Sequence, residues 1–186
     1  MTTTDAERHF TTDELEKRLP GVHGAPVEVG RVELVIRRPV QGRRELLDEA
    51  TLDLERGVVG DRWSLGRSNG RPPNLLAQVT LMSARAADLV AGEKERWPLA
   101  GDQLYVELDI SEANLPPGTR LAVGTAVLEV SDEPHTGCKK FVERFGIDAM
   151  RFVNSPEGRA LRLRGMNTRI VEPGVVRPGD EIRKLA

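Results

Sequence analysis

The chain has 186 residues, a formal net charge of -2 and an isoelectric point near 6.0. This length suits one domain with a sizeable hydrophobic core. The nearly balanced charge gives no overall attraction to nucleic acid or to an anionic membrane, and aromatic residues, at 4% of the chain, leave little surface for stacking bases. We therefore expect neither nucleic acid nor membrane as a partner.

The first 20 residues are polar and mixed in charge, without the apolar stretch of a signal peptide. The longest stretch without a charged residue, 72–84, opens with two prolines and is too short to cross a bilayer. The chain also has a single cysteine. Together these features predict a protein of the reducing cytoplasm.

The elements expected first along the chain are an arm and a strand. Residues 1–25 are predicted to form an N-terminal arm, with a helix over 13–19 that Pro20 ends, and residues 26–186 the main domain. Val32, Leu34 and Ile36 alternate with the residues between them, as in a half-buried strand. The nearly continuous apolar run at 74–82 predicts a strand buried on both faces. Ser83 is then placed to cap a helix that extends through Trp97.

The second half of the chain is predicted to be rich in short strands. These are 104–108, a hairpin of 120–123 and 126–130 around Gly124-Thr125, and two final strands at 162–172 and 181–185. Phe141 and Phe145 share one face of a short helix that ends at Gly146, and Asp148 is placed to cap another. Many short strands with few helices predict a mainly β fold: a mainly antiparallel, closed or nearly closed β-barrel with two to four short helices.

Cys138 lies in the segment His135-Thr136-Gly137-Cys138-Lys139-Lys140. As the only cysteine it cannot form an intrachain disulfide. Three roles remain open: a buried apolar side chain, a reactive thiolate, or a metal ligand. Two lysines after the cysteine and a histidine before it favour the thiolate if the site is partly open.

Charge is distributed unevenly around this segment. Acidic residues outnumber basic ones over 86–133, and basic residues outnumber acidic ones over 139–169. The basic segment is either a solvated face or the wall of a pocket that receives an anion such as phosphate. An unbroken strand over 162–172 would place Arg169 on the same side as Asn167, whereas Arg162 and Arg164 are expected at the surface.

Five motifs occur in an order that resembles a known family. They are Gly-Val-Val-Gly-Asp-Arg at 57–62, Val-Thr-Leu-Met-Ser at 79–83, Gly-Thr-Arg-Leu-Ala-Val-Gly-Thr-Ala-Val-Leu-Glu-Val at 118–130, the segment of Cys138, and the stretch 164–182 that begins Arg-Gly-Met-Asn-Thr-Arg. Together, from about Arg31 to Lys184, they resemble a MOSC domain, named for the C-terminal part of molybdenum cofactor sulfurases.

The resemblance implies a β-barrel with a pocket for a molybdopterin-type cofactor, and a cysteine whose sulfur ligates molybdenum or carries sulfur for it. Cys138 falls on that position and is the candidate catalytic residue and metal ligand. A soft thiolate suits molybdenum, and a pterin phosphate needs cationic partners. The candidate residues for binding the cofactor are Lys139, Lys140, Arg144, Asn167, Arg169, Asp61 and Arg62.

The sequence also departs from the family pattern. Trp63 stands where many members carry histidine after Gly-Asp-Arg, so no histidine role is expected there. Thr136 and Gly137 precede the cysteine where relatives commonly have a proline. The large pyridoxal-phosphate domain of full sulfurases has no counterpart in a chain of this length, so pyridoxal phosphate is not expected.

Three functions follow from this interpretation. The first is an oxidoreductase that reduces N-hydroxylated compounds and takes electrons from a separate partner protein, since the chain has no flavin, haem or iron–sulfur motif. The second is a module that carries the cofactor or relays sulfur as a persulfide on Cys138. The third is a barrel without a ligand, in which Cys138 is part of the core.

Overall fold

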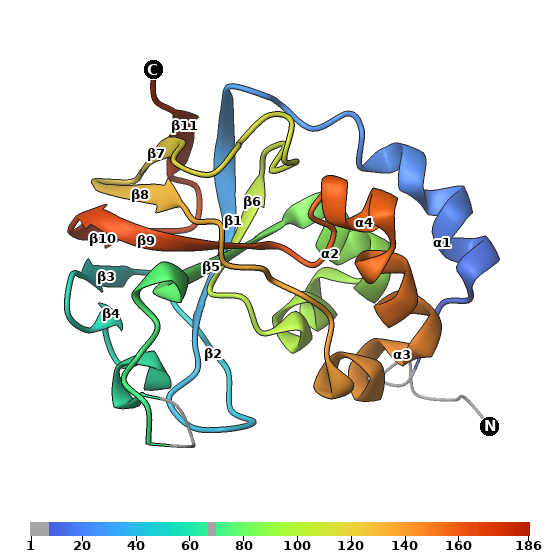
Figure 1. Cartoon of the computed structure of the whole chain (residues 1–186), viewed down its shortest axis with the longest axis horizontal. Helices are drawn as coiled ribbons and strands as arrows, with labels where there is room; N and C mark the ends of the chain where they lie inside the picture. Colours follow the sequence, from blue (N-terminus) through green and yellow to red (C-terminus); the bar gives the residue numbers. More distant parts are fainter. Residues whose placement is uncertain (1–7, 67–69) are drawn as a thin grey trace.

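The computed structural model describes residues 8–66 and 70–186, and a closed β-barrel dominates this part of the chain (Figure 1). Its strands follow the order β11-β7-β8-β9-β5-β6-β1, and pairing of β1 with β11 closes the ring. Neighbouring strands are antiparallel except β5 and β6, which are parallel. The predicted mainly antiparallel barrel is confirmed. Its strands are β1 (Val29–Arg37), β5 (Val79–Ser83), β6 (Leu104–Glu107), β7 (Arg120–Val123), β8 (Ala126–Val130), β9 (Met166–Glu172) and β11 (Glu181–Lys184).

Short strands extend the barrel at two places. β2 (Glu45–Leu46) pairs with the end of β1. A separate small sheet has the order β10-β3-β4, formed by Gly174–Val176, Ala50–Asp53 and Gly57–Val58. This sheet lies at the left of the molecule in Figure 1, on the side of the barrel away from the α-helices.

The α-helices gather on the opposite side of the barrel (Figure 1). They are α1 (Thr12–Arg18), α2 (Ala84–Ala91), α3 (Lys139–Asn154) and α4 (Pro156–Ala160). Two short 3-10 helices, η2 (Leu19–Gly21) and η5 (Lys94–Ala100), pack against them, whereas η3 (Arg62–Leu65) packs against β4 and η4 (Leu75–Ala77) against β9. The expected two to four helices are therefore present within the described chain. None of the described helices has the length and apolar character needed to cross a bilayer.

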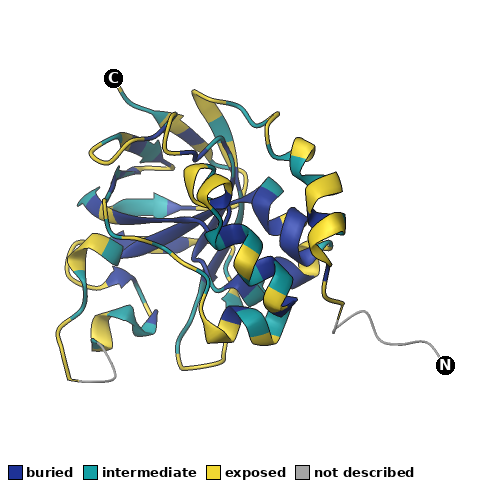
Figure 2. Ribbon diagram, turned by 45° about the vertical axis from the view of Figure 1, so that its right-hand side comes forward, coloured by how far each residue is buried: buried dark blue, intermediate teal, exposed yellow. Residues whose placement is uncertain are grey.

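Two hydrophobic cores hold this arrangement together, one inside the barrel and one between the barrel and the helices (Figure 2). Strand β5 serves both, because Leu81 faces the barrel interior and Met82 the helices. The prediction of a strand buried on both faces is confirmed for 79–83, although residues 75–77 form η4 instead.

The alternation predicted for β1 is wrong in detail. Val32 and Val35 are buried inside the barrel, whereas Leu34 and Ile36 pack toward the helices. The pairing of β1 with β6 shifts register between Val32 and Leu34, as at a β-bulge. An extra residue in one strand reverses the faces that follow it. The bulge therefore lets one strand contribute to both cores.

The described part of the predicted N-terminal arm packs against the helical core. Phe10 is 4% exposed and Leu15 is fully buried. The predicted helix is present as α1; Thr11 and Glu14 form a reciprocal capping box at its start, and Pro20 lies in the 3-10 turn that follows. Residues 1–7 of the arm lie outside the described residues.

One helix end and two helix caps differ from the sequence prediction. Helix α2 stops at Ala91, because Gly92 adopts a φ of 83°, and Trp97 belongs to η5. Ser83 precedes α2 but makes no capping hydrogen bond. The carboxylate of Asp148, predicted to cap a helix, accepts from the Thr12 backbone N–H.

On either side of α4, the predicted break in α3 is confirmed, whereas the predicted start of β9 is wrong. Gly146, with a φ of 90°, interrupts α3 at the predicted end of the first helix. Strand β9 begins at Met166 rather than at 162. Arg162, the start of the predicted strand, instead adopts a left-handed φ of 49°. The chain therefore turns between α4 and β9 before it enters the barrel.

Candidate functional site

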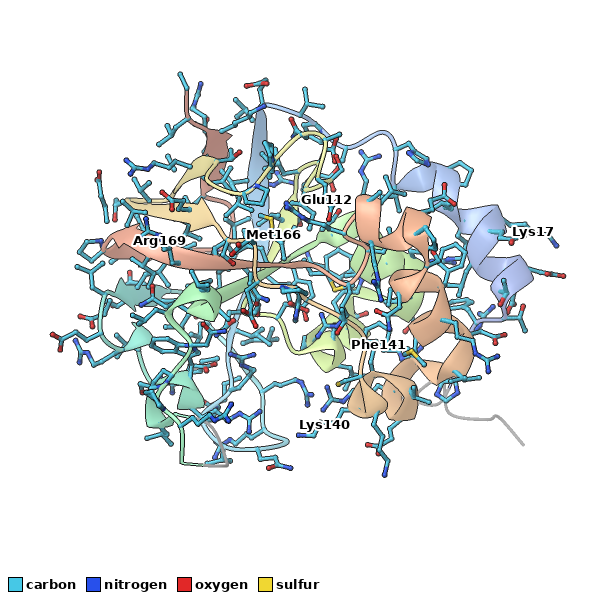
Figure 3. The ribbon with its side chains drawn as sticks, viewed as in Figure 1. Lys17, Glu112, Lys140, Phe141, Met166 and Arg169 are labelled. Carbon is cyan, nitrogen blue, oxygen red and sulfur yellow. The ribbon has the colours of Figure 1, made fainter. Side chains whose placement is uncertain are left out.

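A cleft of about 890 Å³ opens between the loop after β1, the 3-10 helix η3 and the start of α3. Hereafter "the cleft" means this hollow, whose polar and aromatic lining includes Arg38, Gln41, Arg62, Trp63, Asn74, Glu133, Lys140 and Asn167. Its size lies in the range of small-molecule and cofactor sites. Lys140 extends from the start of α3 on the lower side of the molecule (Figure 3). The cleft therefore combines cationic and amide groups from segments far apart in sequence.

Beside the cleft, four arginine side chains converge on the carboxyl end of η5. Arg44 and Arg144 donate to the Leu99 carbonyl at 3.4 and 2.8 Å. Arg164 donates to the Ala100 carbonyl at 3.0 Å, and Arg38 to the Gly101 carbonyl at 3.0 Å. The last carbonyls of a helix lack partners within the helix and carry its negative pole, so they attract cations. The end of η5 thus gathers guanidinium groups supplied by the loop between β1 and β2, α3 and the turn before β9.

Only part of this positive charge is neutralised. Asp61 pairs with Arg38 at 3.0 Å and Asp102 with Arg164 at 2.6 Å. Arg44 and Arg144 have no carboxylate within salt-bridge distance among the described residues. Burial lowers the pKa of Arg44, and the charges of Arg144, Arg38 and Arg62 lower it further. These arginines therefore repel one another, and an anion bound among them would be stabilised.

Cys138 lies at the edge of this cationic region. Its residue is exposed, and it is the N-cap of α3, where its carbonyl accepts the N–H groups of Phe141 at 2.9 Å and Val142 at 3.1 Å. Burial lowers the pKa of Arg144, and the nearby Cys138 raises it in part. The thiol and the Arg144 guanidinium therefore lie within electrostatic range. Because Cys138 is exposed, the interpretation of this residue as part of the core is wrong.

The segment that leads to Cys138 is held by one side chain from β9 and one from the loop between η5 and β6. Asn167 of β9 donates to the carbonyls of Glu133 and Pro134 at 3.1 and 3.2 Å. Asp102 holds the His135 ring, with 2.7 Å between Oδ1 and Nε2. These contacts position residues 133–135 from the barrel side.

Asn154, near the end of α3, fixes the residue next to the cysteine. Its Oδ1 accepts from the Gly137 N–H at 2.9 Å, and its Nδ2 donates to the Gly137 carbonyl at 3.1 Å. A Cβ at Gly137 would come within 3.2 Å of Val153 and 3.3 Å of Asn154. Glycine therefore allows the close approach that places Cys138 at the start of α3. Asn167 and Asn154 thus position the cysteine segment.

Asp102 is the buried charge at the centre of these contacts. Burial by itself would raise the pKa of Asp102, but Arg164 and His135 hold it well below its usual value. Burial lowers the pKa of His135, and Arg164 lowers it further. Asp102 is therefore ionised at neutral pH and the imidazole is neutral. Since an ionised carboxylate can only accept, Nε2 of His135 carries the proton.

Some of the predicted cofactor-binding residues line the cleft, some lie near Cys138 outside it, and others serve the protein's own structure. Arg62 and Lys140 line the cleft, and their charged groups make no hydrogen bond with the described residues. Arg144 lies beside Cys138, whereas Lys139 is exposed and is not part of the cleft lining. Trp63, at the position where relatives often have histidine, also lines the cleft and donates from Nε1 to the Asn74 carbonyl at 3.2 Å.

The other predicted residues serve the protein's own structure. Asp61 has a fully buried side chain that accepts from the Arg38 guanidinium and from the N–H of Trp63. Arg169 is exposed on β9, away from α3 (Figure 3), and donates to Glu129 at 2.8 Å. As predicted, Arg169 shares the outer face of β9 with Asn167, opposite Met166 and Ile170 of the barrel core, but only Asn167 reaches the cysteine segment. Arg164, expected at the surface, is only 9% exposed.

Sequence reasoning missed Arg38, Arg44, Asp102 and Asn154, and it placed Arg164 at the surface. The only local signal was for Asp102, an acidic residue two positions before the apolar strand β6. The others are ordinary surface residue types at unremarkable positions. Their roles depend on carbonyls and carboxylates distant in sequence.

A closed barrel with a cationic cleft and an exposed cysteine at a helix start defines a MOSC-type barrel protein. The family model of the MOSC domain matches residues 74–183, more than half of the chain. The chain belongs to the MOSC domain family and is thus a molybdenum cofactor-associated domain. A comparison with curated protein sequences finds no match.

Solved structures share the fold. The YUAD protein from Bacillus subtilis is 18% identical, with a TM-score of 0.58 over 83% of this chain and 94% of that chain. YiiM from Escherichia coli is 21% identical, with a TM-score of 0.55 over 84% of this chain and 70% of that chain. At these identities the likeness concerns the arrangement of the barrel and its helices.

Proposed function

We propose that the cleft binds a phosphate-bearing molybdenum cofactor with Cys138 as a metal ligand, and that the protein reduces N-hydroxylated compounds. The observation that carries this proposal is the arginine cluster on residues 99–101 beside the exposed Cys138. A pterin phosphate is an anion with several acceptor oxygens. Charge-assisted hydrogen bonds from guanidinium and ammonium groups are the strong ones that such a group recruits.

The residues present fit this group. Arg62 and Lys140 line the cleft with charged groups that make no hydrogen bond among the described residues, so their N–H donors are free for a phosphate. The buried Nε of Arg44 likewise has no partner within the described chain. Arg38 is held in place by Asp61 and lines the same cleft. The cluster is thus pre-organised by internal contacts while donors remain unused.

Cys138 supplies the soft donor. Thiolate sulfur is the protein ligand best matched to a soft metal centre. The Arg144 guanidinium lies within electrostatic range of this sulfur, which is placed at the start of α3. Asn154 and Gly137 fix the backbone on which the sulfur is carried. These features support the proposed role of Cys138.

The proposed reaction breaks the N–O bond of an N-hydroxylated compound. Two electrons and two protons are taken up, and the products are the reduced nitrogen compound and water. The bound cofactor would supply the two-electron chemistry, and a separate donor protein would return the electrons. The chain's own residues bind the anion, orient the thiol and keep the cysteine segment rigid.

The proposal is tested by measuring molybdenum in protein purified from a host that makes the cofactor. Cys138→Ser, Arg62→Met and Lys140→Met should each lower the retained molybdenum, the two cation variants by about tenfold in affinity. Lys17→Met is the matched control, because Lys17 is exposed on α1 at the far side of the molecule (Figure 3). Equal molybdenum in all variants would overturn the cofactor site; full metal without reduction of a benzamidoxime substrate would overturn the reductase.

One observation favours the second candidate, a cofactor carrier or sulfur relay. Cys138 is exposed and is not among the residues that line the cleft, so another protein can reach its sulfur. In a relay, the Cys138 thiolate would attack the outer sulfur of a persulfide donor, form a Cys138 persulfide and release the donor thiolate. Incubation with a persulfide donor should then add one sulfur atom to the tryptic peptide of Cys138. Absence of this mass gain, with reductase activity intact, would reject the relay.

A further inference from the structure

A second cavity lies on the other side of the cysteine segment. It has a volume of about 440 Å³ and is lined by residues of the 131–136 segment, α4 and the start of β9. Hereafter it is "the α4 cavity". Glu112 and Met166, two of its lining residues, are labelled in Figure 3. Glu133 and Asn167 line both this cavity and the cleft, so the 131–136 segment separates the two. The volume lies within the range of small-molecule sites.

His135 gives the α4 cavity a chemically distinctive group. Its side chain is 18% exposed, and Nε2 is held by the fully buried Asp102 at 2.7 Å. The other ring nitrogen, Nδ1, makes no hydrogen bond with any described residue and is not among the buried atoms that lack a partner. Nδ1 is therefore accessible as a hydrogen-bond acceptor, since Nε2 carries the ring proton.

Burial and the charge of Arg164 together lower the pKa of this histidine. Arg164 pairs with the second oxygen of Asp102 at 2.6 Å, so the carboxylate is already compensated and does not need an imidazolium. Arg164 also lines the α4 cavity, is 9% exposed, and has a buried Nε without a partner in the described chain. An oriented neutral imidazole with a free acceptor nitrogen at a cavity wall is an arrangement typical of ligand sites.

The rest of the lining indicates the charge of a ligand. Asp132, Glu133 and Glu112 line the cavity, and their carboxylates make no hydrogen bond or ion pair among the described residues. The guanidinium of Arg159 also lines the cavity and makes no hydrogen bond or ion pair among the described residues. Arg162 instead donates to the carbonyls of Ile110 and Leu115. The unused groups are thus mainly acceptors, which suit a ligand with N–H donors and positive charge.

The backbone conformation of Arg162 is a further sign that the α4 cavity is a functional site. A φ of 49° is uncommon for a residue other than glycine, asparagine or aspartate. Its bonds at 3.2 and 2.7 Å to the carbonyls of residues 110 and 115 hold this conformation. Residues held in sparsely populated regions occur preferentially at functional sites, where surrounding contacts enforce them.

We propose that the α4 cavity binds a small, planar, cationic N–H donor of the amidine or guanidine class. His135 Nδ1 accepts one N–H of this ligand, and Asp132 and Glu133 balance its charge. Asp102 and Arg164 act as positioning residues, because they hold His135 in one tautomer. This site is separate from the cleft and does not depend on the cofactor.

The experiment uses the full chain without cofactor and benzamidine as the probe. The chain contains three histidines, so ¹⁵N spectra of the imidazole rings are simple, and His135→Gln assigns the signal of His135. We expect the Nε2–H tautomer in the free protein and a change at Nδ1 when benzamidine binds. Asp132→Asn with Glu133→Gln should weaken binding about tenfold or more. Glu16→Gln, an exposed residue on α1, is the control and should leave binding unchanged.

Two results would overturn the proposal. One is an unchanged His135 signal at benzamidine concentrations up to about 10 mM. This concentration exceeds the dissociation constant of even a weak specific site, about 1 mM. The other is tighter binding of benzoate, the anionic counterpart of similar size, than of benzamidine. The first result is measured on the wild-type protein, so it refutes the proposal even if a variant fails to fold.

Discussion

Replacement of Asp102 by asparagine tests how the cysteine segment is held. The side chain of Asp102 is fully buried and bridges Arg164 and His135 at 2.6 and 2.7 Å. Asparagine keeps the shape but removes the charge, so the guanidinium of Arg164, 10% exposed, stays buried without its counterion. Breaking a buried pair from one side costs about 3 to 5 kcal/mol. We expect a loss near the lower value, about 3 kcal/mol, because the Ala100 carbonyl still accepts from Arg164.

Equilibrium unfolding in urea, followed by tryptophan fluorescence, measures this loss. The control is Asp88→Asn, which removes a pair with Arg18 whose side chains are 52% and 34% exposed. Exposed pairs contribute about 0 to 1 kcal/mol, so the control should change the free energy of unfolding little. A double variant, Asp102→Asn with Arg164→Met, should recover part of the loss because it leaves no buried charge.

The dependence of this loss on pH follows from the depressed pKa of Asp102. An acid with a lower pKa in the folded state stabilises the protein above the pKa of the unfolded group, about 3.9, and loses this contribution as pH falls through the folded value. The difference between wild type and Asp102→Asn should therefore persist at pH 5 to 8 and shrink only below about pH 4. If Asp102→Asn costs no more than Asp88→Asn, the buried pair does not hold this region together.

Three further variants probe the same segment. The pKa of His135 is lowered in the folded state, so its contribution to stability is lost as pH falls below about 6.5; His135→Gln should flatten the urea midpoint between pH 7 and 5, and an unchanged slope would contradict this. Asn154→Ala removes two hydrogen bonds to Gly137 and should cost about 1 to 3 kcal/mol while changing the alkylation rate of Cys138 by iodoacetamide; an unaltered rate would show that Asn154 does not position the thiol. Cys138→Ser should change the free energy of unfolding by about 1 kcal/mol or less, because the side chain is exposed, and a larger loss would return Cys138 to the core.

The sequence predicted local features where the physical cause is local. The hairpin at Gly124-Thr125 forms where glycine and alternating apolar residues indicate it. The first part of α3 ends at Gly146, since a φ of 90° is easy for glycine alone. Helix α2 was predicted too long, because its end was set at Trp97 before Pro98, whereas Gly92 already ends the helix. The bulge in β1 left no sequence signal, since it depends on the partner strand.

By itself, then, the sequence determined the β-barrel class, the family and the position of Cys138 at the start of a helix. Tertiary structure alone decided which charges form the site. The guanidiniums of Arg38, Arg44, Arg144 and Arg164 meet at the three carbonyls of 99–101, and Asp61 and Asp102 are buried as the counterions of Arg38 and Arg164. A charged side chain has no periodic pattern that separates a solvated role from a buried one. That distinction depends on the carbonyls and carboxylates that the fold brings within hydrogen-bond distance.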